Sequence, residues 1–134
     1  MRAIEKYIPQ IARQWYQLKQ ETAFAQLEIE WSVPLCATYL QEVLEKPGSY
    51  IAIEVTNGKV TAACGASLVH LLTPPHPLTV TEWLWTGTGK PAARVWKECR
   101  EWGKAQGALL AHCAVGKQGK SKVKFTESYQ WRVL

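Results

Sequence analysis

The chain has 134 residues, of which 47% are hydrophobic and 20% charged, so it has the length of one domain and an ordinary globular composition. Its formal net charge is +5, and no stretch reaches the roughly 18 apolar residues of a membrane-spanning helix. We therefore expect a single domain over residues 1–134, with no signal peptide, no membrane partner and a cytoplasmic location.

Positive charge is concentrated in the second half of the chain. Residues 1–67 hold six Lys or Arg and seven Glu, a net charge of −1, whereas residues 68–134 hold ten and four, a net charge of +6. This asymmetry favours an anionic partner such as a phosphorylated cofactor, a nucleic acid or an acidic protein. The basic cluster Lys117–Lys124 is explained equally well by solubility.

Two helices are expected first. Apolar residues recur at helical spacing from Ile4 to Leu18 and predict a helix over residues 8–21, with Pro9 in its first turn. Thr22–Trp31 is expected to be looser, with part of a helical turn. Ser32 is a candidate N-cap for a second helix, Val33–Lys46, which Pro47-Gly48 ends. The residues expected to face inward from this helix are Leu35, Tyr39, Leu40, Val43 and Leu44.

The pattern then changes to the period of two that is typical of strands. Tyr50–Val55 is a predicted strand, and Asn57-Gly58 is a strong hairpin signal because both residues tolerate positive φ. The return strand is Lys59–Leu71, in which Gly65 predicts a bulge or kink. A rigid loop, Thr73–Pro77, follows, and its His76 is expected to be solvated.

The stretch Leu78–Gly107 is the part of the sequence that suggests a chemistry. It predicts a buried strand (Leu78–Trp85), a glycine turn (Gly87-Thr88-Gly89-Lys90) and an amphipathic helix (Pro91–Gln106). The first N–H groups of a helix have no intrahelical partner, and the helix dipole adds partial positive charge there. A glycine turn that leads into a helix is therefore a candidate anion site.

The remaining elements set the fold class. Ala108–Val115 predicts a buried strand parallel to its neighbour through the helix, Gly116–Lys124 a loop or short helix, and Phe125 with Tyr129–Leu134 a last strand. The expected order is α-α-β-β-β-α-β-(α)-β. This order indicates an α/β (α+β) domain with a mixed, mostly antiparallel β-sheet flanked by helices.

Several stretches in this order resemble the GNAT superfamily of acyl-CoA-dependent N-acetyltransferases. They are Ile8-Pro9-Gln10-Ile11, the hairpin from Tyr50–Val55 through Asn57-Gly58-Lys59-Val60 to Ala63-Cys64-Gly65, the strand Glu82-Trp83-Leu84-Trp85, and the helix end Trp102-Gly103-Lys104-Ala105-Gln106-Gly107-Ala108. The resemblance covers most of the chain and is one of pattern and order. Compact domains of this kind are frequent in bacteria and their phages, which suggests a prokaryotic or phage source.

The resemblance implies that acetyl-CoA is the cosubstrate and that its pyrophosphate lies on the glycine turn. The family's loop, Gln/Arg-x-x-Gly-x-Gly/Ala, aligns with Thr86–Pro91, so Thr86 replaces the Arg or Gln and Pro91 the last small residue. Pro91 has no N–H to donate. The remaining implied donors are the N–H groups of Gly87, Thr88, Gly89, Lys90 and Ala92, and Lys90 adds a positive charge.

The resemblance also implies that the strand before the turn binds the pantetheine arm. The backbone of Trp83, Leu84 and Trp85 would diverge from the strand Ala108–Val115 and bond the pantetheine amides. The alternative interpretation is a plain turn that joins a strand to a helix.

Glu82 is the candidate general base, because transfer of an acyl group to an amine requires the neutral amine. Apolar neighbours in the strand could raise its pKa, and an outward-facing or ion-paired Glu82 is the alternative. The family's usual acid, a Tyr before a Gly-Phe pair, is absent from Ser121–Phe125, and Tyr129 is expected to pack. A CoA thiolate can also leave without an acid.

The histidines and cysteines suggest no metal site. Cys36, Cys64, Cys99 and Cys113 form no CxxC pair and are expected to be free, mostly buried thiols. Core packing is the preferred interpretation for His70, His112 and Cys113. No metal-ligand spacing is present.

Three functions from different classes follow. The first is an acetyl-CoA-dependent N-acetyltransferase that acts on a small amine or a protein. The second is a catalytically degenerate GNAT-like binding module, for instance a phage protein that binds a host protein, which the altered loop and the missing Tyr favour. The third is a nucleic-acid binder that uses Lys117–Lys124, which we rank last. The sequence determines neither the acceptor nor whether the chain forms a homo-oligomer.

Overall fold

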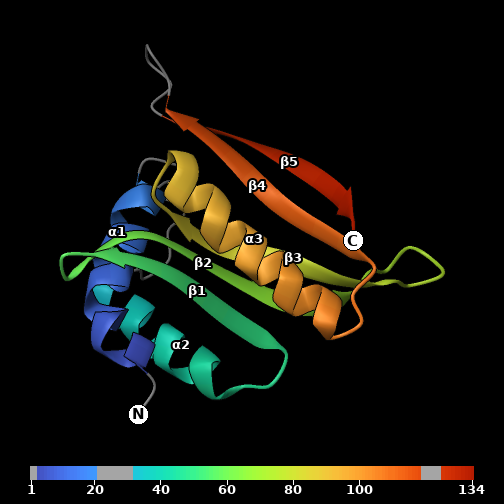
Figure 1. The fold of residues 1–134 in the computed structure, drawn as a ribbon, viewed down its shortest axis with the longest axis horizontal. Helices are drawn as coiled ribbons and strands as arrows, with labels where there is room; N and C mark the ends of the chain where they lie inside the picture. Colours follow the sequence, from blue (N-terminus) through green and yellow to red (C-terminus); the bar gives the residue numbers. More distant parts are fainter. Residues whose placement is uncertain (1–2, 21–31, 119–124) are drawn as a thin grey trace.

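The structure is a computed structural model that describes residues 3–20, 32–118 and 125–134. It consists of one five-stranded mixed sheet flanked by helices (Figure 1), so the expected fold class is confirmed. The elements are η1 (Ala3–Tyr7), α1 (Ile8–Gln20), α2 (Val33–Glu45), β1 (Ser49–Thr56), β2 (Lys59–His70), β3 (Leu78–Thr86), α3 (Gly89–Ala105), β4 (Leu110–Gln118) and β5 (Phe125–Val133). No helix in these ranges is long and apolar enough to cross a membrane.

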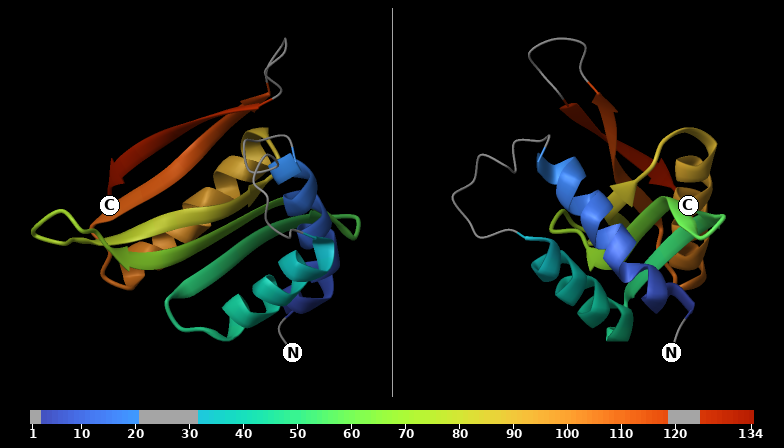
Figure 2. Two further views of the ribbon diagram at one scale, coloured as in Figure 1. Left: turned by 180° about the vertical axis from the view of Figure 1, so that it is seen from behind. Right: turned by 90° about the vertical axis from the view of Figure 1, so that its left-hand side faces the viewer.

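The strands lie side by side in the order of the chain, β1-β2-β3-β4-β5. Every neighbouring pair is antiparallel except β3 and β4, which are parallel because α3 carries the chain back between them. The parallel pairing expected from the sequence is therefore confirmed. Figure 2 shows α1 and α2 on one face of the sheet and α3 on the other.

Each face of the sheet has its own apolar core. On the first face, Ile11 of α1 and Leu40 of α2 belong to one core cluster with Leu84 of β3. Helix α3 packs Val95 and Cys99 against the second face. Two residues expected to face inward from α2 do not do so fully, because Leu35 and Tyr39 are each 43% exposed.

The Ser32 N-cap is confirmed, since its hydroxyl accepts a hydrogen bond from Leu35 N. The looser stretch expected over Thr22–Trp31 lies outside the described residues.

The hairpin and the irregularity expected in the central strands are both present. Asn57 and Gly58 have φ values of 52° and 74°, as the hairpin turn requires. The pairing of β2 with β3 shifts after Gly65, which pairs with Leu84, while Ala66 pairs with Glu82. The extra residue of this bulge is Trp83, on β3, rather than a residue of β2.

The C-terminal elements differ from expectation in one respect. Residues Gly116–Gln118, expected in a loop or short helix, continue strand β4. Strand β5 is continuous from Phe125 to Val133 and pairs with β4 along its whole length, from Leu110 with Val133 to Gln118 with Phe125. The ladder extends because the antiparallel partner satisfies the backbone of β4 up to Gln118. Residues 119–124 of the expected loop lie outside the described part.

Candidate functional site

The candidate site begins where two parallel strands separate. Strands β3 and β4 pair over three residue pairs, from Thr79 with Leu110 to Thr81 with His112. Beyond these pairs the strands diverge while α3 crosses the sheet beside them (Figure 1). The expected divergence of the β3 backbone from the following strand is thus present in the structure.

The bulge decides which side chains of β3 face the opening. In a regular strand, successive side chains alternate between the two faces. The extra residue breaks this alternation, so Trp83 and Leu84 both belong to the core beneath α1 and α2, while Glu82 and Trp85 line the opening beside α3. Trp83 is fixed by ring contacts with Trp15 and by a 2.9 Å hydrogen bond from its Nε1 to Ser67 Oγ.

The opening is a cleft of about 430 Å³ between β3, β4 and the start of α3. Six of the nine candidate residues line it, namely Glu82, Trp85, Gly87, Thr88, Gly89 and Ala92. The other three do not: the side chains of Trp83 and Leu84 lie on the opposite face, and Lys90 is exposed outside the lining. The resemblance implied contacts through the backbone of Trp83 and Leu84 only. The position of their side chains on the opposite face does not conflict with such contacts.

Gly87 is the glycine that the turn requires on two grounds. Its φ is +88°, and a Cβ placed on it would lie 2.4 Å from Thr61 O and 2.9 Å from the Cα of Ala62. Gly89 also has a positive φ, +63°, but a Cβ there would meet no atom within 4 Å. The backbone of the turn therefore lies against β2 at Gly87 and is open at Gly89.

The residue that replaces the family's Arg or Gln has a structural partner. Thr86 is 4% exposed, and its hydroxyl donates a 3.1 Å hydrogen bond to Gln14 Oε1 on α1. Gln14 Nε2 in turn donates to Val60 O over 2.9 Å. Thr86 thus ties the end of β3 to α1 and β2.

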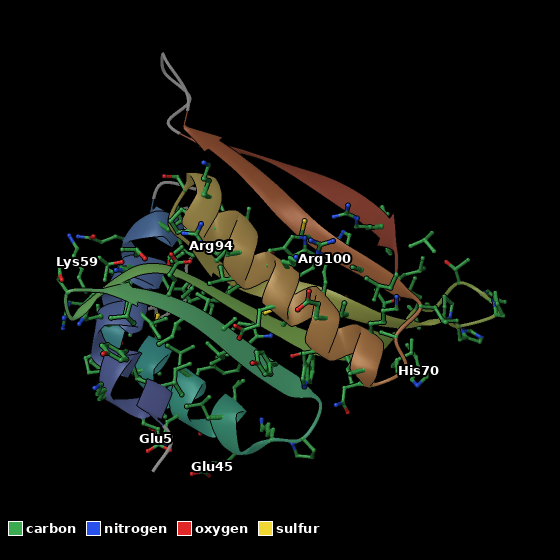
Figure 3. All side chains as sticks on the ribbon, in the orientation of Figure 1. Glu5, Glu45, Lys59, His70, Arg94 and Arg100 are labelled. Carbon is green, nitrogen blue, oxygen red and sulfur yellow. The ribbon has the colours of Figure 1, made fainter. Side chains whose placement is uncertain are left out.

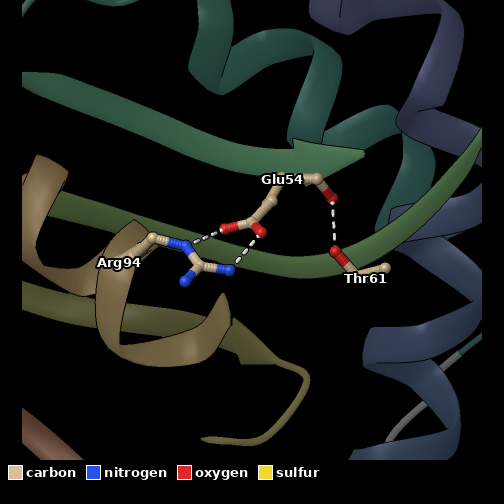
Figure 4. A network of polar contacts seen from close by, with 3 residues as sticks. All are labelled: Glu54, Thr61 and Arg94. Carbon is tan, nitrogen blue, oxygen red and sulfur yellow. Dashed lines mark hydrogen bonds and ion pairs between the residues drawn. The ribbon is translucent and has the colours of Figure 1, made fainter. Parts of the chain in front are cut away.

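The start of α3 is held on the sheet by an ion pair. Arg94 donates two hydrogen bonds to the Glu54 carboxylate on β1, one of them 2.8 Å long from Nε, and the carbonyl of Glu54 accepts a bond from Thr61 (Figure 4). The hydrogen bonds from Arg94, together with its charge, lower the pKa of the Glu54 carboxyl below its usual value. The N-cap residue Thr88 makes no side-chain capping bond, so the first turn of α3 presents its N–H groups beside the glycine turn.

Two thiols and two further side chains of the cleft were not singled out by the sequence as site residues. Cys64, Cys113, Trp96 and Arg132 also line it. Cys113 was expected in the core but reaches the cleft from β4. Burial raises the pKa of the Cys113 thiol, the Glu82 carboxylate raises it further, and the Arg100 guanidinium lowers it. The register of β4 with β5, which pairs Ala111 with Arg132, places Arg132 here, and no local motif marks it.

The three histidines do not line the cleft. His76 is exposed, as expected, and its Nδ1 lies 2.8 Å from Leu71 O in the same loop. His70 is also exposed, contrary to expectation, at the end of β2, while His112 packs against Trp131 with tilted rings whose centroids are 4.4 Å apart. Most of Lys117–Lys124 lies outside the described residues. Among those described, no group of three or more His, Cys, Asp or Glu side chains could hold a metal ion.

Comparison with solved structures identifies the architecture. The structure matches a ribosomal-protein-alanine N-acetyltransferase from Brucella melitensis with a TM-score of 0.70 at 9% identity, covering 100% of this chain and 98% of that one. An N-acetyltransferase from Staphylococcus aureus gives a TM-score of 0.70 at 9% identity, with coverage of 96% and 93%. An acetyltransferase of the GNAT family from Streptococcus pneumoniae gives 0.62 at 11%, with coverage of 97% and 95%.

At these identities the likeness establishes the fold: the chain has the GNAT fold that its sequence resembles. No protein-family model matches the sequence, and no curated protein matches it.

The two glycines of the turn should respond differently to substitution. Gly87→Ala should lower the free energy of unfolding by about 2–5 kcal/mol, because left-handed strain of about 1–2 kcal/mol adds to a clash with β2 of about 1–3 kcal/mol. Gly89→Ala should cost only the strain, about 1–2 kcal/mol. Urea denaturation of both variants measures the difference, and equal losses would contradict the close approach of Gly87 to Thr61.

The position of Glu82 beside Cys113 can be tested by alkylation. Glu82→Gln removes the carboxylate that raises the thiol pKa, so the pKa should fall toward its usual value and more thiolate should be present at any pH below it. Iodoacetamide should then modify Cys113 faster than in the parent protein, as followed by peptide mass spectrometry across a pH series. Glu45→Gln, on exposed α2 sequence, is the control. If Glu82→Gln leaves the pH profile of Cys113 alkylation unchanged, the Glu82 carboxylate does not act on the Cys113 thiol.

Proposed function

We propose that this chain is an acyl-CoA-dependent N-acetyltransferase that transfers an acetyl group to an amine of a small molecule or protein. The observation that carries the proposal is the cleft between the diverging strands β3 and β4, which ends at a glycine turn and an uncapped helix start. This arrangement offers an open site whose end at the helix start is suited to an anion. The GNAT fold supports acetyl-CoA as the donor.

In this proposal the pyrophosphate of acetyl-CoA lies on the turn from Gly87 to Ala92. The N–H groups of Gly87, Thr88, Gly89, Lys90 and Ala92 donate to its oxygens, and the dipole of α3 stabilises its negative charge. Gly89 leaves open space for the phosphates, since a Cβ on it would meet no protein atom within 4 Å. Pro91 contributes no donor, and the exposed ammonium of Lys90 compensates with a full charge.

The pantetheine arm then runs along β3 toward the point where the strands meet. The main-chain groups of Trp83, Leu84 and Trp85 face it on the β4 side, as the edge of a strand faces a partner chain. Small residues on the α3 side, Ala92 and Ala93, leave the width that an extended chain needs. The thioester comes to lie at the end of the cleft that Glu82 and Cys113 line.

The reaction transfers the acetyl group directly. Glu82 accepts a proton from the ammonium form of the acceptor, either directly or through water, and the neutral amine attacks the thioester carbonyl carbon. The C–S bond then breaks, the amide forms, and the sulfur leaves as a thiolate that takes up a proton. Glu82 is suited to the task because it is half-buried on the cleft wall.

A catalytically degenerate binding module is the second candidate. Two observations favour it: the Thr86 hydroxyl is committed to Gln14 rather than to the cleft, and β5 displays exposed apolar side chains, with Trp131 57% and Val133 80% exposed. Such a protein would retain the cleft without turnover.

Titration calorimetry with acetyl-CoA and with free CoA tests the transferase. We expect a dissociation constant of about 1 mM or tighter for acetyl-CoA. Glu82→Gln should leave this constant unchanged and slow acetyl transfer to a panel of amines by about 10²–10⁴-fold, because a general base contributes on that scale. Glu45→Gln is the matched control, and chromatography of released CoA avoids interference from the protein's own thiols.

The outcomes separate the candidates. Absence of any binding signal at millimolar acetyl-CoA contradicts the transferase proposal. If the parent protein binds acetyl-CoA but releases no CoA with any class of amine, the result supports the degenerate binding module. Equal slowing by Glu82→Gln and Glu45→Gln removes Glu82 from the role of base.

A further inference from the structure

A second groove lies between α3 and the C-terminal part of β5. It has a volume of about 250 Å³ and is lined by Lys97, Arg100, Glu101, Lys104 and Arg132, with Val133 and Leu134 at its end. Arg132 also lines an adjoining hollow of about 270 Å³ beside Trp96 and Trp131. Arg132 therefore lines both the groove and the cleft, whereas the other cations of the groove do not line the cleft.

Arg100 is the cation of this groove whose surroundings are described most fully by its contacts. Figure 3 shows its side chain reaching from α3 toward β4. The guanidinium carbon lies 5.9 Å from the centre of the Trp96 ring, which holds the group by a cation–π contact. Its Nε is buried, and no acceptor within the described part of the chain hydrogen-bonds to it. A buried donor without an acceptor is uncommon in native proteins and is expected to meet a water or an ion.

The charges around Arg100 are predominantly of the same sign. Four cationic side chains and one carboxylate line the groove, a sum of +3. Burial lowers the pKa of Arg100, and the positive charge of Arg132 lowers it further. Glu101 offsets this only in part, because it is 67% exposed and lies 3.9 Å from the Lys97 ammonium. The groove side of Arg100 is therefore dominated by cationic side chains.

We propose that this groove binds an oxyanion, a carboxylate or phosphate group of a small molecule, with Arg100 and Arg132 as its two principal donors. A guanidinium presents several N–H groups in a plane that matches the oxygens of either anion, and the bonds are strengthened by charge. The anion satisfies the buried Nε of Arg100 and relieves the repulsion between the two arginines. Lys97 and Lys104 add long-range attraction.

This site is distinct from the proposed pyrophosphate site and does not depend on the transferase proposal. The glycine turn leads into the first turn of α3, whereas Arg100 lies in the second half of that 17-residue helix and Arg132 on β5. Because Arg132 faces both spaces, an anion bound here places the rest of its molecule within reach of the end of the cleft beside Cys113.

Nuclear magnetic resonance of the full chain tests the site through the Nε–H signal of Arg100, assigned by its loss in Arg100→Gln. Inorganic phosphate and succinate are titrated separately at constant ionic strength and pH 6. We expect at least one of them to shift this signal saturably. Arg132→Gln should weaken that binding by about ten-fold or more, because it removes a charge-assisted donor. Lys59→Gln, an exposed cation at the β1–β2 turn, is the control with the same change in net charge.

Each outcome decides the proposal. A saturable response to phosphate alone or to succinate alone supports it and identifies the anion class, and a response to both supports an unselective oxyanion site. No saturable shift with either probe overturns it, as does equal weakening by Arg132→Gln and Lys59→Gln. If shifts appear only at Gly87–Ala92, the anion belongs to the glycine turn and the groove is not a site. Arg132 is exposed, so its variant is expected to fold, and its amide spectrum verifies this.

Discussion

The contact between Trp83 and Gly65 is the constraint on which the cleft depends. A Cβ on Gly65 would lie 2.8 Å from two atoms of the Trp83 ring, so only glycine at this position of β2 leaves room for the indole. The ring in turn packs against Trp15 and Tyr39, which fix it beneath α1 and α2. The bulge on β3 is thus held by aromatic packing on one side and by an absent side chain on the other.

From this contact the orientation of the rest of β3 follows. Because Trp83 is the extra residue, Glu82 faces α3 and Leu84 faces α1, although strict alternation would put both on the same side. The turn after β3 is positioned by a second close approach, that of Gly87 to the backbone of β2. Thr86 completes the anchorage by bonding to Gln14. The start of α3 is consequently delivered to the open end of the cleft by contacts with β2 and α1.

Local patterns in the sequence were sufficient for most of the fold. Apolar periodicity predicts α1, α2 and α3, Asn57-Gly58 predicts the first hairpin, and the helix between two apolar strands predicts their parallel pairing. Gly65 correctly indicates an irregularity, but a glycine does not reveal which of the two paired strands carries the extra residue. Leu35 and Tyr39 are apolar at helical spacing and yet partly exposed, because spacing alone does not determine how much of the surface of α2 is covered by neighbouring elements.

The candidate site divides in the same way. Its contiguous part, Glu82 to Ala92, was visible in the sequence because a strand, a glycine turn and a helix follow one another. Cys113 and Arg132 were not, because they reach the same space from β4 and β5, and their facing depends on the register between those strands. Alternation along β5 predicts that its side chains point to two opposite faces, but it does not say which face lies toward α3. The pairing of Arg132 with the buried Ala111 places the Arg132 side chain on the α3 face.

The divergence of β3 and β4 has a consequence for where chemistry can gather in this fold. A fully paired parallel ladder would bury the backbone of both strands and place α3 over a closed surface. Here the pairing stops at Thr81 and His112, so β4 and β5 form one wall and β3 with α3 the other. Side chains from both walls, Glu82 from one and Cys113 and Arg132 from the other, therefore meet across a space that neither wall fills. Because Arg132 also lines the groove beside α3, this second wall joins the residues of the cleft to the cations of α3.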